Sequence, residues 1–88
     1  MPTFTKSNRK NKKYMVVYNG KKIHFGDTRY SQYRDSVPLK LYSHLDHKDK
    51  KRQERYLKRA KGIKNAKGEY TYLNPESSNY YSIKYLWN

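Results

Sequence analysis

The chain has 88 residues, of which 21 are Lys or Arg and 7 are Asp or Glu, so its formal net charge is +14. A chain of this length forms at most one domain, with a small hydrophobic core. The absence of cysteine excludes disulfide bonds and a thiolate zinc site. No stretch reaches the roughly 20 apolar residues of a membrane span, and the N-terminal segment lacks the apolar centre of a signal peptide, so we expect neither membrane insertion nor secretion.

Hydrophobic residues make up 34% of the chain, yet 16% of the residues are aromatic and 11 of them are Tyr. This aromatic content separates the chain from a disordered basic tail. A tyrosine ring can line a core while its hydroxyl reaches water or a backbone group. The composition therefore predicts a folded unit whose core is built largely from tyrosine.

The segment from Met1 to Lys13 contains five basic residues and no acidic one. Phe4 is its one large apolar side chain after Met1. We interpret residues 1–13 as an extended, flexible basic arm and residues 14–88 as a single small domain. The basic residues of this arm are Lys6, Arg9, Lys10, Lys12 and Lys13.

Two segments rich in β-formers, residues 14–18 and 22–25, flank Asn19-Gly20. Asn-Gly accepts the positive φ values of a tight hairpin turn, so the pattern predicts a β-hairpin. Residues 27–38 show no clear period, and we expect a loop packed by Tyr30 and Tyr33.

A helix is expected from His47 to Lys61, with Asp46 as its N-cap and Gly62 as a left-handed C-terminal residue. One face of this helix is a narrow, mostly apolar stripe, and the remaining faces are strongly basic. The stripe comprises Gln53, Tyr56, Leu57 and Ala60, and the basic residues are Lys48, Lys50, Lys51, Arg52, Arg55, Lys58, Arg59 and Lys61.

Asn74-Pro75 predicts the start of a second, short helix, because Asn is a good N-cap and Pro is tolerated at the first helical position. The aromatic residues that follow have helical spacing. The expected fold is therefore a small α+β domain in which an N-terminal β-hairpin precedes two helices.

The charge pattern predicts a polyanion partner. Solvated helix faces usually mix both signs of charge, whereas Glu54 is the one acid among the eight basic residues from Lys48 to Lys61. We expect largely sequence-independent contacts with nucleic-acid phosphates, to DNA rather than RNA. The predicted contacts are Lys6, Arg9, Lys10, Lys12, Lys13, Lys48, Lys51, Arg52, Arg55, Lys58, Arg59 and Lys61.

The pairs Arg29-Tyr30 and Tyr33-Arg34 leave two interpretations open. Their rings could stack on unpaired bases while arginine holds the backbone, as in single-strand binders. Alternatively, the rings fill a core that has few aliphatic residues.

Catalysis and metal binding are both disfavoured by the sequence. His44 and His47 lie close to Asp46 and Asp49, but cysteine is absent and a third matching histidine is lacking. The two aspartates are better explained as helix caps at a positive helix terminus. We therefore expect a protein that is not an enzyme and uses no cofactor or metal.

Three ordered segments, Ile23-His24-Phe25-Gly26, the D-x-x-R-x-x-x-Y-x-x-R pattern from Asp49 to Arg59, and the S-x-x-Y-L-W pattern from Ser82 to Trp87, carry a resemblance. Together they resemble a family of small uncharacterised proteins encoded by nucleocytoplasmic large DNA viruses, giant viruses among them. The resemblance implies a viral source and a compact fold, without a known activity. It places the protein in the virion, in the host-cell cytoplasm where a viral factory forms, or in the nucleus.

Two partners remain open in that setting. The first is nucleic acid, with the protein associated with the viral genome. The second is an acidic capsid protein, with this chain acting as a minor capsid or cement component, because Tyr and Arg are favoured at buried protein contacts.

Overall fold

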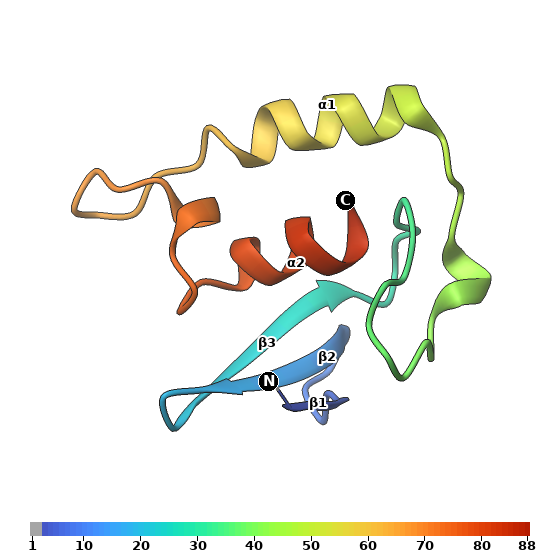
Figure 1. Ribbon diagram of the computed structural model, residues 1–88, viewed down its shortest axis with the longest axis horizontal. Coiled ribbons are helices and arrows are strands. Elements are labelled where there is room, and N and C mark those ends of the chain that lie inside the picture. The colour runs from blue at the N-terminus through green and yellow to red at the C-terminus, as the bar shows by residue number, and fades with distance from the viewer. Residues whose placement is uncertain (1–2) are drawn as a thin grey trace.

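A computed structural model describes residues 3–88, and its N-terminal part is a three-stranded antiparallel sheet (Figure 1). The strands are β1 (Thr3–Lys6), β2 (Lys12–Tyr18) and β3 (Lys21–Asp27), in the spatial order β1-β2-β3. Asn19 and Gly20 both adopt positive φ, at 49° and 77°, in the turn between β2 and β3. The predicted hairpin is therefore confirmed, as is the α+β class of the fold.

The prediction of a flexible arm is wrong for residues 3–13, because Thr3–Lys6 pairs with β2 along its whole length. The Phe4 ring anchors this strand, with its centroid 6.1 Å from that of Phe25 and 4.7 Å from that of Tyr85. The packing of the partly buried Phe4 ring against the core and the hydrogen bonds to β2 outweigh the charge repulsion expected of this segment. The domain boundary predicted at residue 14 therefore falls inside the sheet, and residues 1–2 lie outside the described residues.

Helix α1 (Lys50–Ala60) begins three residues later than predicted, because Asp49 rather than Asp46 caps it. The Asp49 carboxylate accepts hydrogen bonds from the backbone N–H groups of Lys51 (2.9 Å) and Arg52 (3.3 Å). Lys48 has a φ of 55° and interrupts the chain before the cap. At the other end, Gly62 does not take the positive φ that the sequence predicted.

Helix α2 (Ser78–Leu86) also begins later than expected, with Ser77 as its N-cap. The Ser77 hydroxyl accepts from the Asn79 N–H at 3.2 Å. Asn74 instead forms a turn before the helix, since its side chain accepts from the Glu76 N–H and its carbonyl from the Ser77 N–H. Two single turns of 3₁₀ helix, Ser43–Leu45 and Thr71–Leu73, precede α1 and α2 respectively.

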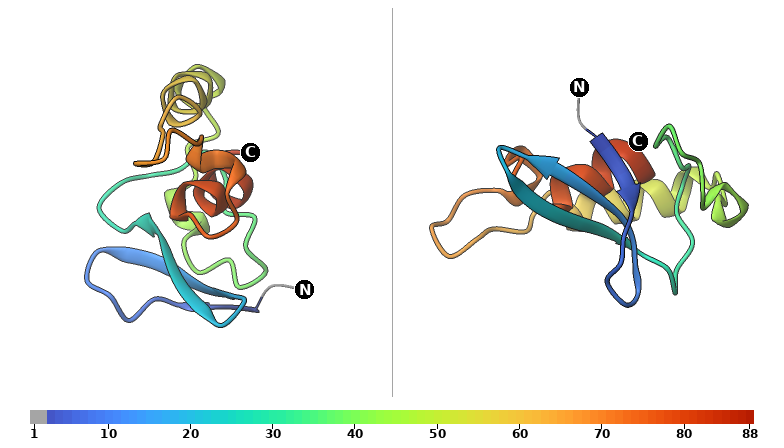
Figure 2. Two further views of the ribbon diagram at one scale, coloured as in Figure 1. Left: turned by 90° about the vertical axis from the view of Figure 1, so that its left-hand side faces the viewer. Right: turned by 90° about the horizontal axis from the view of Figure 1, so that it is seen from below.

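The sheet and the two helices stack as three layers, with α2 between the sheet and α1 (Figures 1 and 2). One face of the sheet contributes alternate side chains of β2 and β3 to the core, and α2 covers this face. Val37, from the loop after β3, completes the core. The buried apolar cluster consists of Tyr14, Val16, Ile23, Phe25, Val37, Tyr81 and Leu86.

Buried polar groups, rather than the tyrosines that we expected, hold the loop of residues 28–49. Asp35 is buried and accepts hydrogen bonds from the Tyr14 hydroxyl (2.5 Å) and from the backbone N–H groups of Val37 and Tyr42. Asp46 accepts from the side-chain amide of Gln32 and from the Asp35 N–H, which explains why it does not cap α1. Burial and the hydrogen bond to Asp35 raise the pKa of Tyr14, so its hydroxyl stays protonated in this network.

Gly26, within the H-F-G segment, lies against the C-terminal end of α2. Its φ is 79°, and a Cβ built on it would lie 2.9 Å from Leu86 Cδ1 and 3.1 Å from Lys13 Cβ. Glycine is required here for both the backbone conformation and the close approach. None of the helices in residues 3–88 combines the length and the apolar character needed to cross a membrane.

Candidate functional site

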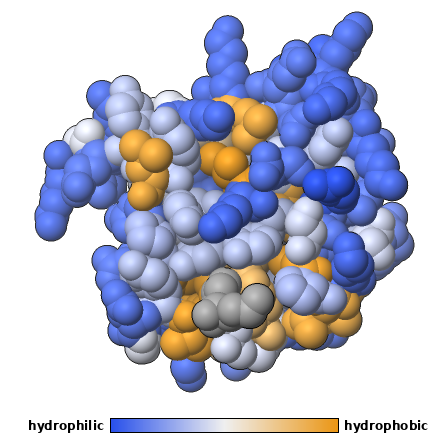
Figure 3. All heavy atoms as spheres, viewed as in Figure 1, coloured by the Kyte–Doolittle hydropathy of each residue, from blue (hydrophilic) through white to orange (hydrophobic). Residues whose placement is uncertain are grey.

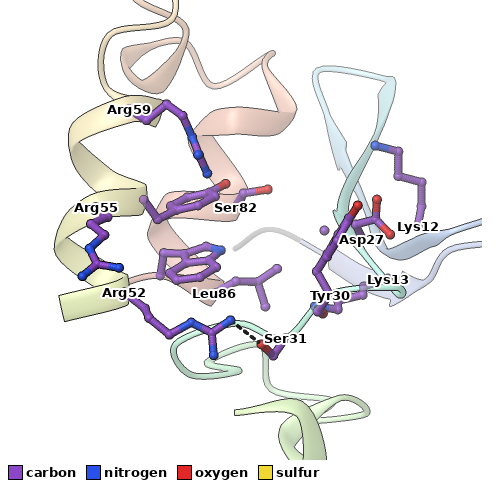
Figure 4. A pocket seen from close by; sticks show the side chains of 13 residues that line it. Lys12, Lys13, Asp27, Tyr30, Ser31, Arg52, Arg55, Arg59, Ser82 and Leu86 are labelled. Atoms are coloured by element: carbon purple, nitrogen blue, oxygen red, sulfur yellow. Dashed lines mark hydrogen bonds between the residues drawn. The ribbon is translucent and has the colours of Figure 1, made fainter. Parts of the chain in front are cut away.

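A cleft of about 540 Å³ opens where the ends of β2 and β3 face α1 and the C-terminal end of α2 (Figure 4). The sheet and the loop after it form one wall, and the two helices form the other. On the first wall lie Lys12, Lys13, Gly26, Asp27, Tyr30 and Ser31. On the second lie Arg52, Arg55, Tyr56, Arg59, Ser82, Leu86 and Trp87.

Helix α1 presents a row of three arginines to this cleft. Arg52, Arg55 and Arg59 occupy positions i, i+3 and i+7, so they share one face of the helix with Tyr56 at i+4. The orientation of α1 about its own axis decides that this face is directed toward the cleft. Gln53 and Ala60, at the two ends of the predicted stripe, are buried, and the Gln53 side-chain amide donates to the Trp87 carbonyl at 2.9 Å.

A stacked aromatic pair holds α1 against the end of α2. The rings of Tyr56 and Trp87 lie nearly parallel, with an interplanar angle of 8° and centroids 4.0 Å apart. His47 packs beside the tryptophan, at 5.2 Å between centroids. Burial raises the pKa of the Tyr56 hydroxyl. The pair therefore fixes the helix-side wall, and the resulting cleft has aromatic as well as cationic surface.

The one carboxylate that lines the cleft is already neutralised. Arg29 reaches both oxygens of Asp27, with Nη2 to Oδ2 at 2.8 Å and Nε to Oδ1 at 3.0 Å. These hydrogen bonds lower the pKa of Asp27 to about 2. Among residues 3–88 this is the one ion pair within 4 Å, so four cleft cations have no carboxylate partner. They are Lys12, Arg52, Arg55 and Arg59.

Lys13 was predicted to contact a polyanion, and its burial makes that assignment wrong. The side chain is 1% exposed, and Nζ donates to the Tyr30 carbonyl at 2.9 Å and to the side-chain oxygen of Gln32. Burial lowers the pKa of Lys13 to about 8, against the opposing attraction of Asp27, Asp35 and Asp46. The lysine therefore ties the loop after β3 to the sheet beneath the cleft.

The lowered pKa of Lys13 predicts how stability depends on pH. Between pH 8 and 10.5 the unfolded chain keeps a proton at Lys13 that the folded chain has lost, so folding becomes more favourable as the pH rises. We expect the free energy of unfolding of the wild type, relative to that of Lys13→Met, to increase across this window. Urea unfolding of both proteins at several pH values measures it, and parallel curves would contradict the assignment.

The other predicted contacts lie outside the cleft. Lys6, Arg9 and Lys10 are exposed on and after β1, and Lys48 precedes the α1 cap. On α1, the helical spacing places Lys51 and Lys58 on the face away from the buried stripe. Lys61 lies at the C-cap, with its Nζ 5.8 Å from the centroid of the Tyr72 ring. The structure thus divides the predicted set, and Lys12, Arg52, Arg55 and Arg59 are the exposed or partly exposed members that it brings together.

Tyr30, Ser31 and Trp87 line the cleft and were not predicted as contacts. For Arg29-Tyr30 the sequence leaves open whether the ring stacks on bases or fills the core, because the sequence does not show which tyrosines stay outside the core. Ser31 accepts a hydrogen bond from Arg52 Nη2 at 3.2 Å across the cleft. That contact joins two segments far apart in the sequence, so no local pattern could indicate it.

Three of the four residues in the metal-site hypothesis, Asp46, His47 and Asp49, have other roles. Asp46 belongs to the polar network of the loop, and Asp49 caps α1. The Nδ1 atom of His47 accepts from the Asp49 N–H at 2.9 Å. Within residues 3–88, no three His, Asp or Glu side chains gather as metal ligands would.

The model of a family of unknown function, DUF5754, matches residues 3–38 of this chain. No curated protein and no solved structure matches this chain. The matched residues cover the sheet and the sheet-side wall of the cleft but none of α1. They include His24-Phe25-Gly26 but neither of the other two segments on which the predicted resemblance to viral proteins rests, so a viral source stays a prediction.

Proposed function

We propose that this protein binds nucleic acid, through contacts between the cleft cations and backbone phosphates. The observation that carries the proposal is the convergence of Lys12, Arg52, Arg55 and Arg59 on one cleft, with no carboxylate left to pair with them. Guanidinium groups match phosphate oxygens in geometry as well as charge. A concave wall of one charge sign also focuses the field and draws anions toward it.

Charge outside the cleft supports the same partner. Hydrophilic side chains project along the edge that α1 forms, while apolar atoms show as separate patches (Figure 3). The net charge of +14 provides a long-range attraction for a polyanion, and the cleft provides defined contacts. We expect DNA rather than RNA as the partner.

The proposal includes no catalytic step. General acid–base chemistry requires a group whose pKa lies near the working pH. Asp27 is the acid in the cleft, and its pairing with Arg29 keeps its pKa near 2. Lys13 has a pKa of about 8, but its side chain is buried beneath the cleft and its Nζ is held by the Tyr30 carbonyl and by Gln32. Of the two tyrosines that line the cleft, Tyr56 has a hydroxyl whose pKa is raised by burial, so it forms the nucleophilic phenolate less readily.

The biological setting of this proposal rests on the sequence resemblance to proteins of large DNA viruses. In that setting the protein would associate with the viral genome in the virion, the viral factory or the nucleus. Arginine also pairs with carboxylates, so an acidic capsid protein is the alternative partner. A polymer that carries carboxylates instead of phosphates separates the two.

The test is a fluorescence-anisotropy titration with single-stranded DNA, duplex DNA, RNA and polyglutamate, each across a salt series. If the four cleft cations each neutralise one phosphate, the logarithm of affinity should fall against the logarithm of salt with a slope of about −3 to −4. We expect tighter binding to DNA than to polyglutamate. Polyglutamate binding as tight as DNA binding, or a slope near zero, would overturn the proposal.

A further inference from the structure

Tyr30 is an aromatic side chain on the cleft that the core does not use. Its ring is 66% exposed, and it lies across the cleft from Arg52 and Arg59 of α1 (Figure 4). The backbone of the residue is held in place, since its carbonyl accepts from Lys13 Nζ at 2.9 Å and its N–H donates to the Asp27 carbonyl at 3.2 Å. An exposed ring on a fixed backbone is pre-organised for stacking.

The arginine row on the opposite wall suits an extended phosphate backbone. Arg59 lies seven positions after Arg52, so the row extends roughly 10 Å along the helix axis at 1.5 Å per residue. Arg52 is oriented by its hydrogen bond to Ser31, which belongs to the same loop as Tyr30. A strand lying along α1 would therefore have its phosphates on one wall and its bases toward the other.

The position of Tyr30 distinguishes a single strand from a duplex. In a duplex the bases are stacked and paired inside, so a ring in a protein cleft reaches a base face only when that base is unpaired. Proteins that hold single strands combine a basic groove with aromatic side chains on which bases stack. The volume of about 540 Å³ lies within the range of sites that enclose small organic groups.

We propose that the cleft binds an unpaired segment of nucleic acid, with phosphates on Arg52, Arg55 and Arg59 and a base stacked on Tyr30. This inference rests on the proposed function and adds the form of the ligand. A free strand, a fraying end or a gap in a duplex each presents the required unpaired nucleotide.

The test compares Tyr30→Ala with Tyr70→Ala, using a short single-stranded DNA and the same sequence as a blunt duplex. Tyr70 is a matched control because it is 43% exposed and lines a different hollow, with Lys64 Nζ 4.9 Å from its ring centroid. We expect Tyr30→Ala to weaken single-strand binding about tenfold and to leave duplex binding unchanged. Tyr30→Phe should retain the wild-type affinity, because stacking needs the ring and not the hydroxyl.

Equal single-strand affinity for Tyr30→Ala and Tyr70→Ala would overturn the stacking assignment. A wild type that prefers the blunt duplex would overturn the assignment of an unpaired ligand. Either result leaves the proposed function standing if replacement of the cleft arginines still weakens DNA binding strongly. Both proposals would be overturned if Tyr30→Ala bound single-stranded DNA as tightly as the wild type and the variant without the cleft arginines also kept its affinity for DNA.

Discussion

Replacement of Arg52, Arg55 and Arg59 by glutamine in one protein lowers the affinity for single-stranded DNA by about a hundredfold at moderate salt. Each lost phosphate contact removes counterion release worth about 0.7 in the salt slope, so the slope should become shallower by about 2. The fold should survive, because none of the three arginines forms an ion pair and all three are exposed. Anisotropy titrations across a salt series measure both quantities.

A matched control removes the same charge from the same helix. Lys51, Lys58 and Lys61 are exposed on α1 or at its C-cap, and none of them lines the cleft. Their combined replacement by glutamine should cost less than about tenfold in affinity, through the weaker long-range field. If both triple variants lost affinity equally, binding would depend on total charge, and the cleft would not be the site. Thermal melting of both variants verifies that each remains folded.

Trp87→Ala should lower the free energy of unfolding by about 3 kcal/mol, the scale for truncating a large packed aromatic side chain. Its ring stacks on Tyr56 at 4.0 Å and packs against His47 at 5.2 Å, so it connects α1 and the chain before it to α2. For a domain of this size, such a loss lowers the melting temperature by roughly 10 to 25 °C. A small basic domain has little stability in reserve, and thermal or urea unfolding would show the effect.

Tyr70→Ala serves again as the control, because it also truncates an aromatic side chain, one that is 43% exposed and outside the core cluster. It should shift the melting temperature by only a few degrees. A wild-type melting curve for Trp87→Ala would show that the tryptophan stabilises nothing and that the helix-side wall of the cleft is held by other contacts. In that case Trp87 would become a candidate ligand contact.

The charged face of α1 was predictable because a helix converts sequence spacing directly into faces. The stripe from Gln53 to Ala60 predicted which side packs, and the burial of those two residues confirms it. The spacing could not predict which part of the structure each face beside the stripe would meet. Only the packing of α1 against α2, across the cleft from the sheet, separates the arginine face from the face of Lys51 and Lys58.

The cap positions show the same limit at shorter range. Asp46 and Asp49 are both plausible caps by residue type, and the choice between them is made by contacts from another segment. Gln32 and the Asp35 N–H engage Asp46, which leaves Asp49 to cap the helix. Local propensity thus predicted the helix, and a tertiary hydrogen-bond network set its first residue.

By itself, the sequence determined the α+β class, the Asn-Gly hairpin, the two helices and the positive charge on the faces of α1 outside its stripe. All of these depend on residues close together along the chain, where spacing, turn chemistry and charge act directly. Tertiary structure decided that Phe4 makes β1 part of the sheet, that Lys13 is buried, and that Lys12 faces the arginines of α1. Those outcomes depend on which distant segments meet and on which groups lose their water, and desolvation is a property of the folded chain alone.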